Sequence, residues 1–413
     1  MKAAAKWPSL PLTEAFWFQE GPGVRNWQFT SSGIKLLNVA NIEKGGTLNL
    51  EKTDRHLDED EVAKKYSHFL VDAGDLVIAS SGISFDDDGL LRTRGAFVRD
   101  EHLPLCLNTS TIRFKAIDGM SDLRFLRLWL NGREFRSQIT KFVTGTAQQN
   151  FGPSHLKATK ITLPPLAEQR RIAEVLDRAE ALRAKRRAAL AQLDSLTQSL
   201  FLDLFGDPAT KGWAMTDIAG VVNEADGSIR TGPFGSQLLH SEFTDDGIAV
   251  LGIDNAVANE FRWGERRFIS EAKYRQLKRY TVRPGDVLIT IMGTCGRCAV
   301  VPDDIPPAIN TKHLCCITLD PAKCLPIFLH AYFLRHPIAL KYLNQTAKGA
   351  IMSGLNMGLI KGMPVPLPPI PLQREFARRV TAVEALKTAQ RASLAELDAL
   401  FATLQHRAFR GEL

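Results

Sequence analysis

The sequence predicts an α+β protein built as an internal repeat, in which two similar domains are each followed by a long helix. The first observation is a segment that recurs 204 residues later. The second is that each copy of this segment opens a long stretch dominated by helix-forming residues. The third is that the chain before each copy consists of short apolar runs broken by Gly, Pro and Asp, as in α+β domains.

The repeat is strongest in its helical part. The segment "LPPLAEQRRIAEVL" (Leu163–Leu176) recurs as "LPPIPLQREFARRV" (Leu367–Val380), and the alignment continues without a gap through the helix that follows. Upstream, the copies agree only in short apolar runs and turns, as expected for two copies of one domain whose loops differ in length. The sequence therefore predicts a pseudo-twofold arrangement with domains at 1–162 and 207–366 and helical segments at 163–206 and 367–413.

Within each domain, short apolar runs that end in turn residues predict strands. The expected strands are Lys35–Val39, Leu76–Ser80, Gly95–Val98, Thr111–Phe114, Val250–Ile253, Val287–Ile291, Ala299–Val301 and His313–Thr318. The expected helices are Glu59–Tyr66, Ser121–Leu130 and Pro326–Leu343.

Each helical segment predicts a long rod that begins after a Pro-Pro pair, since proline is favoured near helix starts. Apolar residues in the first segment alternate at spacings of three and four, which is typical of a coiled-coil seam. The expected seam is Ile172, Val175, Ala179, Leu182, Ala189, Leu193, Leu196 and Leu200, with Arg186 as a polar member and Gln390 as its counterpart. About 40 residues give a rod of about 60 Å. We expect the two rods to pair antiparallel; packing of each rod on its own domain alone is the alternative.

Bulk composition narrows the class of protein. The chain of 413 residues is long for one core and carries a net charge of +7, which favours a polyanionic partner. Six cysteines do not indicate a disulfide framework, and the N-terminus lacks an apolar signal region, so a cytoplasmic location is expected. The longest apolar run, Cys324–Leu334, is too short to cross a bilayer, so no membrane partner is expected.

Polar loops at equivalent places in the two domains are the candidate ligand contacts. An apolar strand leads into "SSGIS" (Ser80–Ser84) in the first domain and into "TIMGTCGR" (Thr290–Arg297) in the second. Gln and Asn suit adenine and Arg suits guanine in the major groove of DNA. The candidates are Ser80, Ser81, Arg92, Arg94, Thr144, Thr146, Gln148, Gln149, Thr290, Thr294, Arg297, Lys312, His313 and Lys348. The alternative is that these are only polar surface loops.

Sequence signatures of catalysis are missing. The chain has no Gly-Lys dipeptide, hence no phosphate-binding loop of the Walker type, and no Asn-Pro-Pro-aromatic signature of adenine methyltransferases. Cys295 and Cys298 form a C-x-x-C pair that could build a zinc site with the downstream His313, Cys315, Cys316 and Cys324, but adjacent strand residues such as Cys315 and Cys316 point to opposite faces. We therefore expect no metal and no cofactor in this chain, with the thiols filling a core.

The motifs then identify a family. The chain resembles the DNA specificity (S) subunits of type I restriction-modification systems along essentially its full length. The resemblance rests on "LPPLAEQRRIAEVLDRAEAL" (Leu163–Leu182), its copy at Leu367–Leu386, "GPFGSQL" (Gly232–Leu238) and "AFRGEL" (Ala408–Leu413). It implies two target-recognition domains separated by two conserved helical regions.

The resemblance also implies partners. An S subunit performs no chemistry. It binds double-stranded DNA and docks methyltransferase (M) subunits, of which we expect two, which use S-adenosylmethionine to methylate adenine N6. Restriction (R) subunits supply ATP- and Mg-dependent translocation and cleavage. We expect Gln169, Arg170, Gln373 and Arg374, just after the two helix starts, to contact the M subunits.

A bipartite DNA target agrees with this organisation, because two readers on a rigid rod would contact two half-sites at a fixed separation. Two alternatives stay open. The chain could be the recognition region of a fused restriction-methylation enzyme, or a coiled-coil adaptor that binds only protein.

Overall fold

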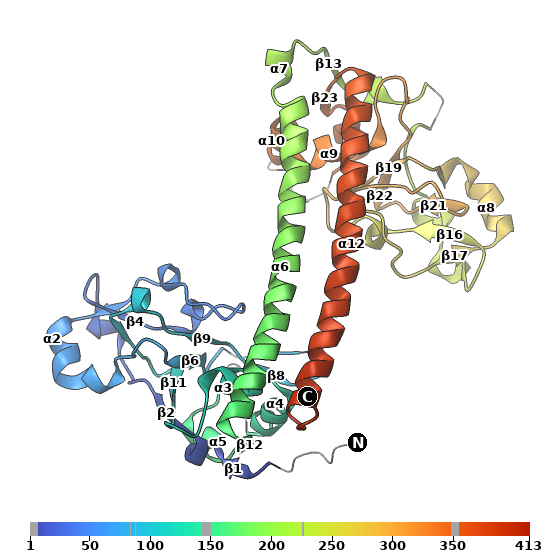
Figure 1. Ribbon diagram of the computed structural model, residues 1–413. Helices are drawn as coiled ribbons and strands as arrows, with labels where there is room; N and C mark the ends of the chain where they lie inside the picture. Colours follow the sequence, from blue (N-terminus) through green and yellow to red (C-terminus); the bar gives the residue numbers. More distant parts are fainter. Residues whose placement is uncertain (1–6, 83, 87, 143–149, 225–226, 348–354) are drawn as a thin grey trace. The chain divides into compact units, whose positions relative to one another are not determined.

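The computed structural model describes residues 7–413 except 83, 87, 143–149, 225–226 and 348–354. The chain divides into two compact units (Figure 1). Unit 1 comprises Met1–Arg187 and Ala392–Leu413, and unit 2 comprises Ala188–Arg391. Each unit therefore contains one of the two predicted domains together with part of each long helix.

An antiparallel four-stranded sheet forms the centre of the unit 1 domain. Its strands lie in the order β2 (Phe16–Glu20), β11 (Thr111–Ala116), β6 (Leu76–Ala79) and β9 (Gly95–Phe97). A second sheet has the order β10 (Leu105–Cys106), β4 (Ile34–Leu36), β5 (His56–Leu57) and β3 (Phe29–Thr30). Two short pairs are formed by β1 (Ser9–Pro11) with β12 (Lys160–Thr162) and by β7 (Ser84–Phe85) with β8 (Leu91–Arg92).

Helices cover one face of this sheet and connect it to the long helix. These helices are α1 (Leu12–Ala15), α3 (Leu123–Leu130), α4 (Arg133–Thr140) and α5 (Pro153–Lys157). A further short helix, α2 (Glu59–Glu61), precedes Val62, which packs with Leu36 and Leu57 of the second sheet. Asp122 begins α3 by accepting hydrogen bonds from the N–H groups of Arg124 and Phe125, the usual role of an Asp N-cap. The helix buries Phe125 and Trp129 in the core that also contains strands β6 and β11.

Unit 2 repeats this architecture. Its main sheet has the order β14 (Ile229–Thr231), β22 (Leu314–Ile317), β19 (Val287–Thr290) and β20 (Cys298–Val300), which matches β2, β11, β6 and β9. The second sheet has the order β15 (Phe243–Thr244), β17 (Phe268–Ile269), β16 (Ile248–Leu251), β21 (Ala308–Asn310) and β18 (Thr281–Val282), and β13 (Met215–Asp217) pairs with β23 (Pro364–Pro366). The helices are α7 (Pro208–Lys211), α8 (Glu271–Leu277), α9 (Pro326–Arg335), α10 (Pro337–Ala347) and α11 (Met357–Lys361). The predicted α+β class and internal repeat are confirmed.

The domains depart from the expected elements, which omitted several short strands and helices such as β21 and α8. The single helix expected over Pro326–Leu343 is instead two helices, α9 and α10, because Pro337 lacks the N–H that would continue α9 and restricts the residue before it. Strands β2 and β14, which begin the two main sheets, were not expected. The segment of β14 is only three residues long, and its pairing with β22 creates a strand that has no local pattern.

The long helices are α6 (Leu166–Phe205) and α12 (Ile370–Ala408). In unit 1 the start of α6 contacts the end of α12, where the Arg171 guanidinium donates to the Leu413 carbonyl oxygen at 3.1 Å. In unit 2 the end of α6 packs on the start of α12 through Phe201 and Phe376, whose ring centroids lie 5.6 Å apart. The helices therefore pair antiparallel, as predicted (Figure 1).

The seam between the helices differs from the one expected. Leu182 and Leu196, predicted to face the partner helix, are 51% and 43% exposed. Thr197 is buried instead, and Arg183 is largely covered. Ile172 and Ala179 of the expected seam are buried. The seam therefore departs from the expected one at Leu182 and Leu196, where the next residue along the chain is covered and the leucine lies on the outer surface.

A matched charge cluster lies on the true seam in each unit. In unit 1, Arg183 pairs with Glu180 on its own helix and with Asp398 on α12, the latter at 2.5 Å. In unit 2, Lys387 pairs with Glu384 and with Asp194 on α6, both at 2.8 Å. The two clusters occupy equivalent positions of the repeat, so they specify the same antiparallel register in both units.

A buried ion pair stabilises each main sheet, but its cation comes from different strands. In unit 1, Arg113 of β11 lies 3.6 Å from Asp75. In unit 2, Arg230 of β14 lies 2.5 Å from Asp286, the counterpart of Asp75. Arg113 is paired across the sheet with Gln19, and Gln19 is the position equivalent to Arg230. The cation is therefore on neighbouring strands in the two copies.

Within the part of the chain that is described, no helix is long and apolar enough to cross a membrane.

Candidate nucleic-acid interface

The ends of strands β6 and β19 position the loops that were predicted to contact a ligand. Ser80, after β6, is buried, and its backbone bonds to Ser110 and Phe151. Thr290 is fully buried, and its hydroxyl donates to the Thr294 carbonyl oxygen and accepts from the Arg297 N–H at 2.9 Å. Ser80 and Thr290 therefore shape the loops from inside and are not exposed to a ligand in this structure.

A polar groove lies beside this loop in the first domain. It consists of two adjoining hollows of about 470 and 430 Å³ that share Ser81 and Ser110. The lining is hydroxyls, amides and basic groups: Asn38, Lys52, Thr53, Arg55, Thr109, Asn150 and His155, with Glu20 and Asp54 as the acids. Such a lining offers hydrogen bonds and positive charge to a phosphate backbone and to base edges.

Arg55 is the best-positioned cation of this groove. Its side chain is exposed, lies over the Phe29 ring at 5.1 Å, and donates a long hydrogen bond of 3.4 Å to Asn38 Oδ1. The same Asn38 oxygen accepts from Asn108 Nδ2 at 2.9 Å. Arg55 is therefore oriented by neutral groups, so its charge stays available to an anion.

The second domain places a cation at the same position. Arg267 precedes β17 as Arg55 precedes β5, and it lies 3.2 Å from Asp254. Burial, together with the positive charges of Lys312 and Arg267, lowers the pKa of His313. His313 is consequently neutral at pH 7 and can both donate and accept a hydrogen bond. Arg267, Lys312 and His313 thus lie close enough together to interact electrostatically.

The predicted contacts differ in their location and exposure. Ser81 and Arg94 lie at the loop after β6, where Arg94 donates to the Gly82 carbonyl oxygen at 3.0 Å. Arg92 is exposed on β8, and Thr294 and Arg297 are exposed after β19. Thr144, Thr146, Gln148, Gln149 and Lys348 lie outside the described residues.

Sequence reasoning missed Arg55 and Arg267, the pair of arginines at equivalent positions of the two domains. A signal was present, since "RHL" (Arg55–Leu57) and "RFI" (Arg267–Ile269) occupy equivalent places and lead into paired strands. The signal is weak, because the two copies share little else in this part of the chain.

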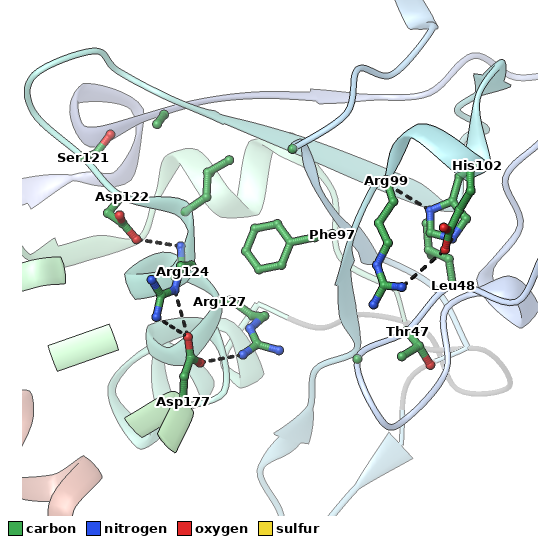
Figure 2. Close-up of a pocket in the computed structure, with 15 residues that line it drawn as sticks. Thr47, Leu48, Phe97, Arg99, His102, Ser121, Asp122, Arg124, Arg127 and Asp177 are labelled. Atoms are coloured by element: carbon green, nitrogen blue, oxygen red, sulfur yellow. Dashed lines mark hydrogen bonds and ion pairs between the residues drawn. The ribbon is translucent and has the colours of Figure 1, made fainter. Parts of the chain in front are cut away.

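A cleft of about 830 Å³ lies between the first domain and α6 (Figure 2). Its cations are already neutralised: Asp177 of α6 accepts from Arg124 and Arg127 at 2.9 Å, and Arg99 pairs with Glu101 at 3.3 Å. This cleft is larger than the groove hollows, but its charges hold the domain to the helix. It is therefore a weaker candidate for binding DNA.

Five of the six cysteines are buried and behave as core residues, and Cys295 is half-buried. Burial raises the pKa of Cys315 and of Cys324 to about 12, so both remain thiols at neutral pH. In the described parts of the chain, no group of three or more His, Cys, Asp or Glu side chains could hold a metal ion.

The four residues expected to dock M subunits fall into two kinds. Arg170 and Arg374 are exposed near the starts of α6 and α12. Gln169 and Gln373 are fully buried, and their amide groups bond within their own unit. Only the two arginines present their side chains to a partner.

Comparison with known proteins places these features in context. The sequence profile of the type I restriction modification DNA specificity domain matches residues 34–192 and 243–398. The type I restriction enzyme EcoBI specificity subunit of Escherichia coli is 27% identical over 343 residues, which cover 75% of this chain and 70% of that protein. The type I restriction enzyme EcoKI specificity subunit of E. coli strain K12 is 23% identical over 311 residues, which cover 68% of this chain and 63% of that protein.

Solved structures share the fold. The S subunit of a type I restriction-modification system from M. genitalium superimposes with a TM-score of 0.57 over 97% of this chain and 96% of that chain, at 17% identity. A chain from a structure on complex assembly and conformational transition of the type I R-M system gives the same TM-score over the full length of both chains, at 19% identity.

Proposed function

The chain belongs to the type I restriction modification DNA specificity family, whose specificity subunits are non-catalytic, and on this premise we propose that it reads a bipartite DNA target. Each domain reads one half-site. The observation that carries the proposal is the recurrence of a basic side chain at one equivalent position, Arg55 beside the polar groove of the first domain and Arg267 in the second. Repetition of the site matches repetition of the target.

Within each domain the proposed contact groups divide into two roles. Arg55, Lys52 and Arg267 contact phosphates, which supplies affinity that falls as salt rises. Hydroxyl and amide groups such as those of Ser81 and Thr294 contact base edges, which supplies specificity.

The experiment is a map of methylated adenines in cells that contain the M subunits, with and without this chain. We expect methylation at one bipartite motif that depends on the chain. If no chain-dependent motif appears, while the complex assembles, the proposed function is wrong. Stoichiometric binding of S-adenosylmethionine by the purified chain would instead favour an enzyme.

Variants separate the two readers. Arg55→Gln and Arg267→Gln should each weaken binding of target DNA by the complex, by roughly tenfold per lost phosphate contact, and reduce the salt slope by about one. The matched control is Arg178→Gln, an exposed arginine of α6 that pairs with Glu174. An equal loss in the control would contradict a role in DNA contact.

The outer surface of the paired helices is the proposed docking site for M subunits. Leu182 lies next to Arg183, and Leu400 lies two residues from Asp398. The Arg183–Asp398 ion pair therefore places the two exposed leucines at a similar height along the helix pair. Leu386 and Leu196 form the equivalent pair in unit 2, 53% and 43% exposed. Two equivalent apolar patches support two M subunits, with Arg170 and Arg374 as polar contacts.

The docking proposal predicts a change in stoichiometry. Leu182→Ser with Leu400→Ser should leave the chain folded, since both side chains are exposed, and remove one of two bound M subunits. Native mass spectrometry of the purified complex measures this directly. The matched control is Leu202→Ser, an exposed leucine outside these pairs. Retention of both M subunits by the double variant would exclude the patch.

The remaining partners follow from the same proposal. The M subunits bring S-adenosylmethionine, and R subunits bring ATP and Mg, to a complex assembled in the cytoplasm. The described residues of this chain support recognition and docking.

A further inference from the structure

A buried glutamine joins the first domain to its long helix. Gln169, in the first turn of α6, has no exposed surface. Its Nε2 donates to the carbonyl oxygens of Met120 at 2.9 Å and Pro164 at 2.8 Å, and its Oε1 accepts from the Asp122 N–H at 2.9 Å. One amide group thereby connects the helix start, the Pro-Pro segment and the residue that caps α3.

Gln373 repeats the connection in unit 2. Its Nε2 donates to the carbonyl oxygens of Lys323 at 3.1 Å and Pro368 at 2.9 Å, and its Oε1 accepts from the Leu325 N–H at 2.8 Å, just before α9. The two domains share little sequence, yet this three-way connection is the same in both. The constraint therefore lies in the join between domain and helix and not in the loops.

Directional bonds add to packing in determining the angle of this join. Ile172 and Leu176 bury themselves against the first domain, and Phe376 and Val380 do so in the second, but apolar burial has no preferred direction. A domain of this size has a radius of gyration of about 15 Å. A rotation of about 13° at the join would move its centre by about 3.4 Å, which is one base pair of DNA.

We propose that Gln169 and Gln373 are positioning residues that hold each recognition domain at the angle that selects one spacer length between the half-sites. The proposal rests on the proposed function, because it requires that the domains read DNA. Neither glutamine touches DNA. Each acts through the domain that it orients, and removing it should alter the permitted spacer while the half-site sequences stay the same.

The two joins should differ in strength. In unit 1 the ion pairs of Arg124 and Arg127 with Asp177 supply further directional contacts between domain and helix (Figure 2). At two of the three equivalent positions unit 2 has Ile327 and Thr381, whose side chains carry no charge. Gln373 therefore bears more of the restraint than Gln169 does.

The test uses the full chain with its M subunits and maps methylated adenines across a genome. In Gln169→Ala and Gln373→Ala we expect motifs whose spacer is one base pair shorter or longer to rise about tenfold relative to the original motif, the scale of one to two lost hydrogen bonds. The effect should be larger in Gln373→Ala. Gln169→Glu and Gln373→Glu keep the size and the acceptor but lose the amide donors, so they should relax the spacer as well.

The control is Leu105→Ala, which creates a cavity in the first domain away from α6. It should lower methylation at the original motif and add no new spacer. If the glutamine variants behave like this control, they are ordinary stabilising residues and the inference is overturned. If an alanine variant fails to fold, its glutamate counterpart decides by the same criterion. Absence of any chain-dependent motif with the unmodified chain would instead overturn the proposed function.

Discussion

At the scale of the residue, the two copies pair an equivalent buried carboxylate with arginines from different strands. Each main sheet buries a carboxylate, Asp75 or Asp286, that accepts a backbone N–H and faces an arginine. The arginine is on β11 in one copy and on β14 in the other. A buried charge must be paired, but the pair needs only proximity, so either strand can supply it.

This interpretation predicts a rescue. Arg113→Gln should destabilise unit 1 by about 1–3 kcal/mol, since it leaves the buried Asp75 with Lys115, 3.7 Å away, in place of its buried arginine. Adding Gln19→Arg, which restores the arrangement of unit 2, should recover most of the loss. Chemical unfolding of the full chain, followed by hydrogen exchange in β6 and β11, measures both effects. If the double variant is as unstable as the single one, an arginine on β2 cannot replace the arginine on β11, and the interpretation is wrong.

At the scale of the element, one side chain at the break between α9 and α10 bonds backbone groups that the helices leave without a partner. His336 is buried at the break, where its Nδ1 accepts the Ile338 N–H at 3.2 Å. Its Nε2 must then carry the proton, and it donates to the Gly206 carbonyl oxygen at the end of α6 at 2.8 Å. The imidazole therefore satisfies both helix ends only while it is neutral.

A pH dependence follows for this element. Burial lowers the pKa of His336 and of His330 in the folded chain below the unfolded value of about 6.5. The stability that these groups contribute is present above that value, and it is lost as the pH falls from 7 towards 5, because the unfolded chain then binds more protons. Hydrogen exchange should show α9 and α10 opening more readily at low pH than α3. In His336→Gln with His330→Gln this difference should shrink, and an unchanged difference would assign it to other groups.

At the scale of the whole molecule, both long helices contribute to both units. Residues before Ala188 in α6 belong to unit 1 and those after it to unit 2, while α12 runs the opposite way. We propose that the length of this helical pair determines the number of unspecified base pairs between the half-sites. The charge clusters of Arg183 and Lys387 would keep the register when that length changes.

An insertion tests this. Seven residues added after Arg187 and seven after Arg391 keep the heptad phase in both helices and lengthen the pair by about 10.5 Å. The methylated motif should gain about three base pairs in its spacer, with both half-sites unchanged. Seven residues added to α6 alone mismatch the helices and serve as the control, which should lose methylation. A change in the half-site sequences would contradict the division between reading domains and spacing helices.

The sequence by itself determined the repeat, the α+β class, the two long helices and the family, because each depends on local patterns or on residues retained between the copies. Strand β14, the true helix seam and the buried roles of Ser80, Thr290, Gln169 and Gln373 were decided only in the tertiary structure. A stripe of leucines at spacings of three and four does not say which of two neighbouring faces is covered, since that depends on Arg183 finding Asp398 across the pair. Likewise, the sequence pattern predicts that a glutamine after a proline pair is exposed. Gln169 and Gln373 are buried because the adjoining domain covers them and its carbonyl oxygens accept their hydrogen bonds.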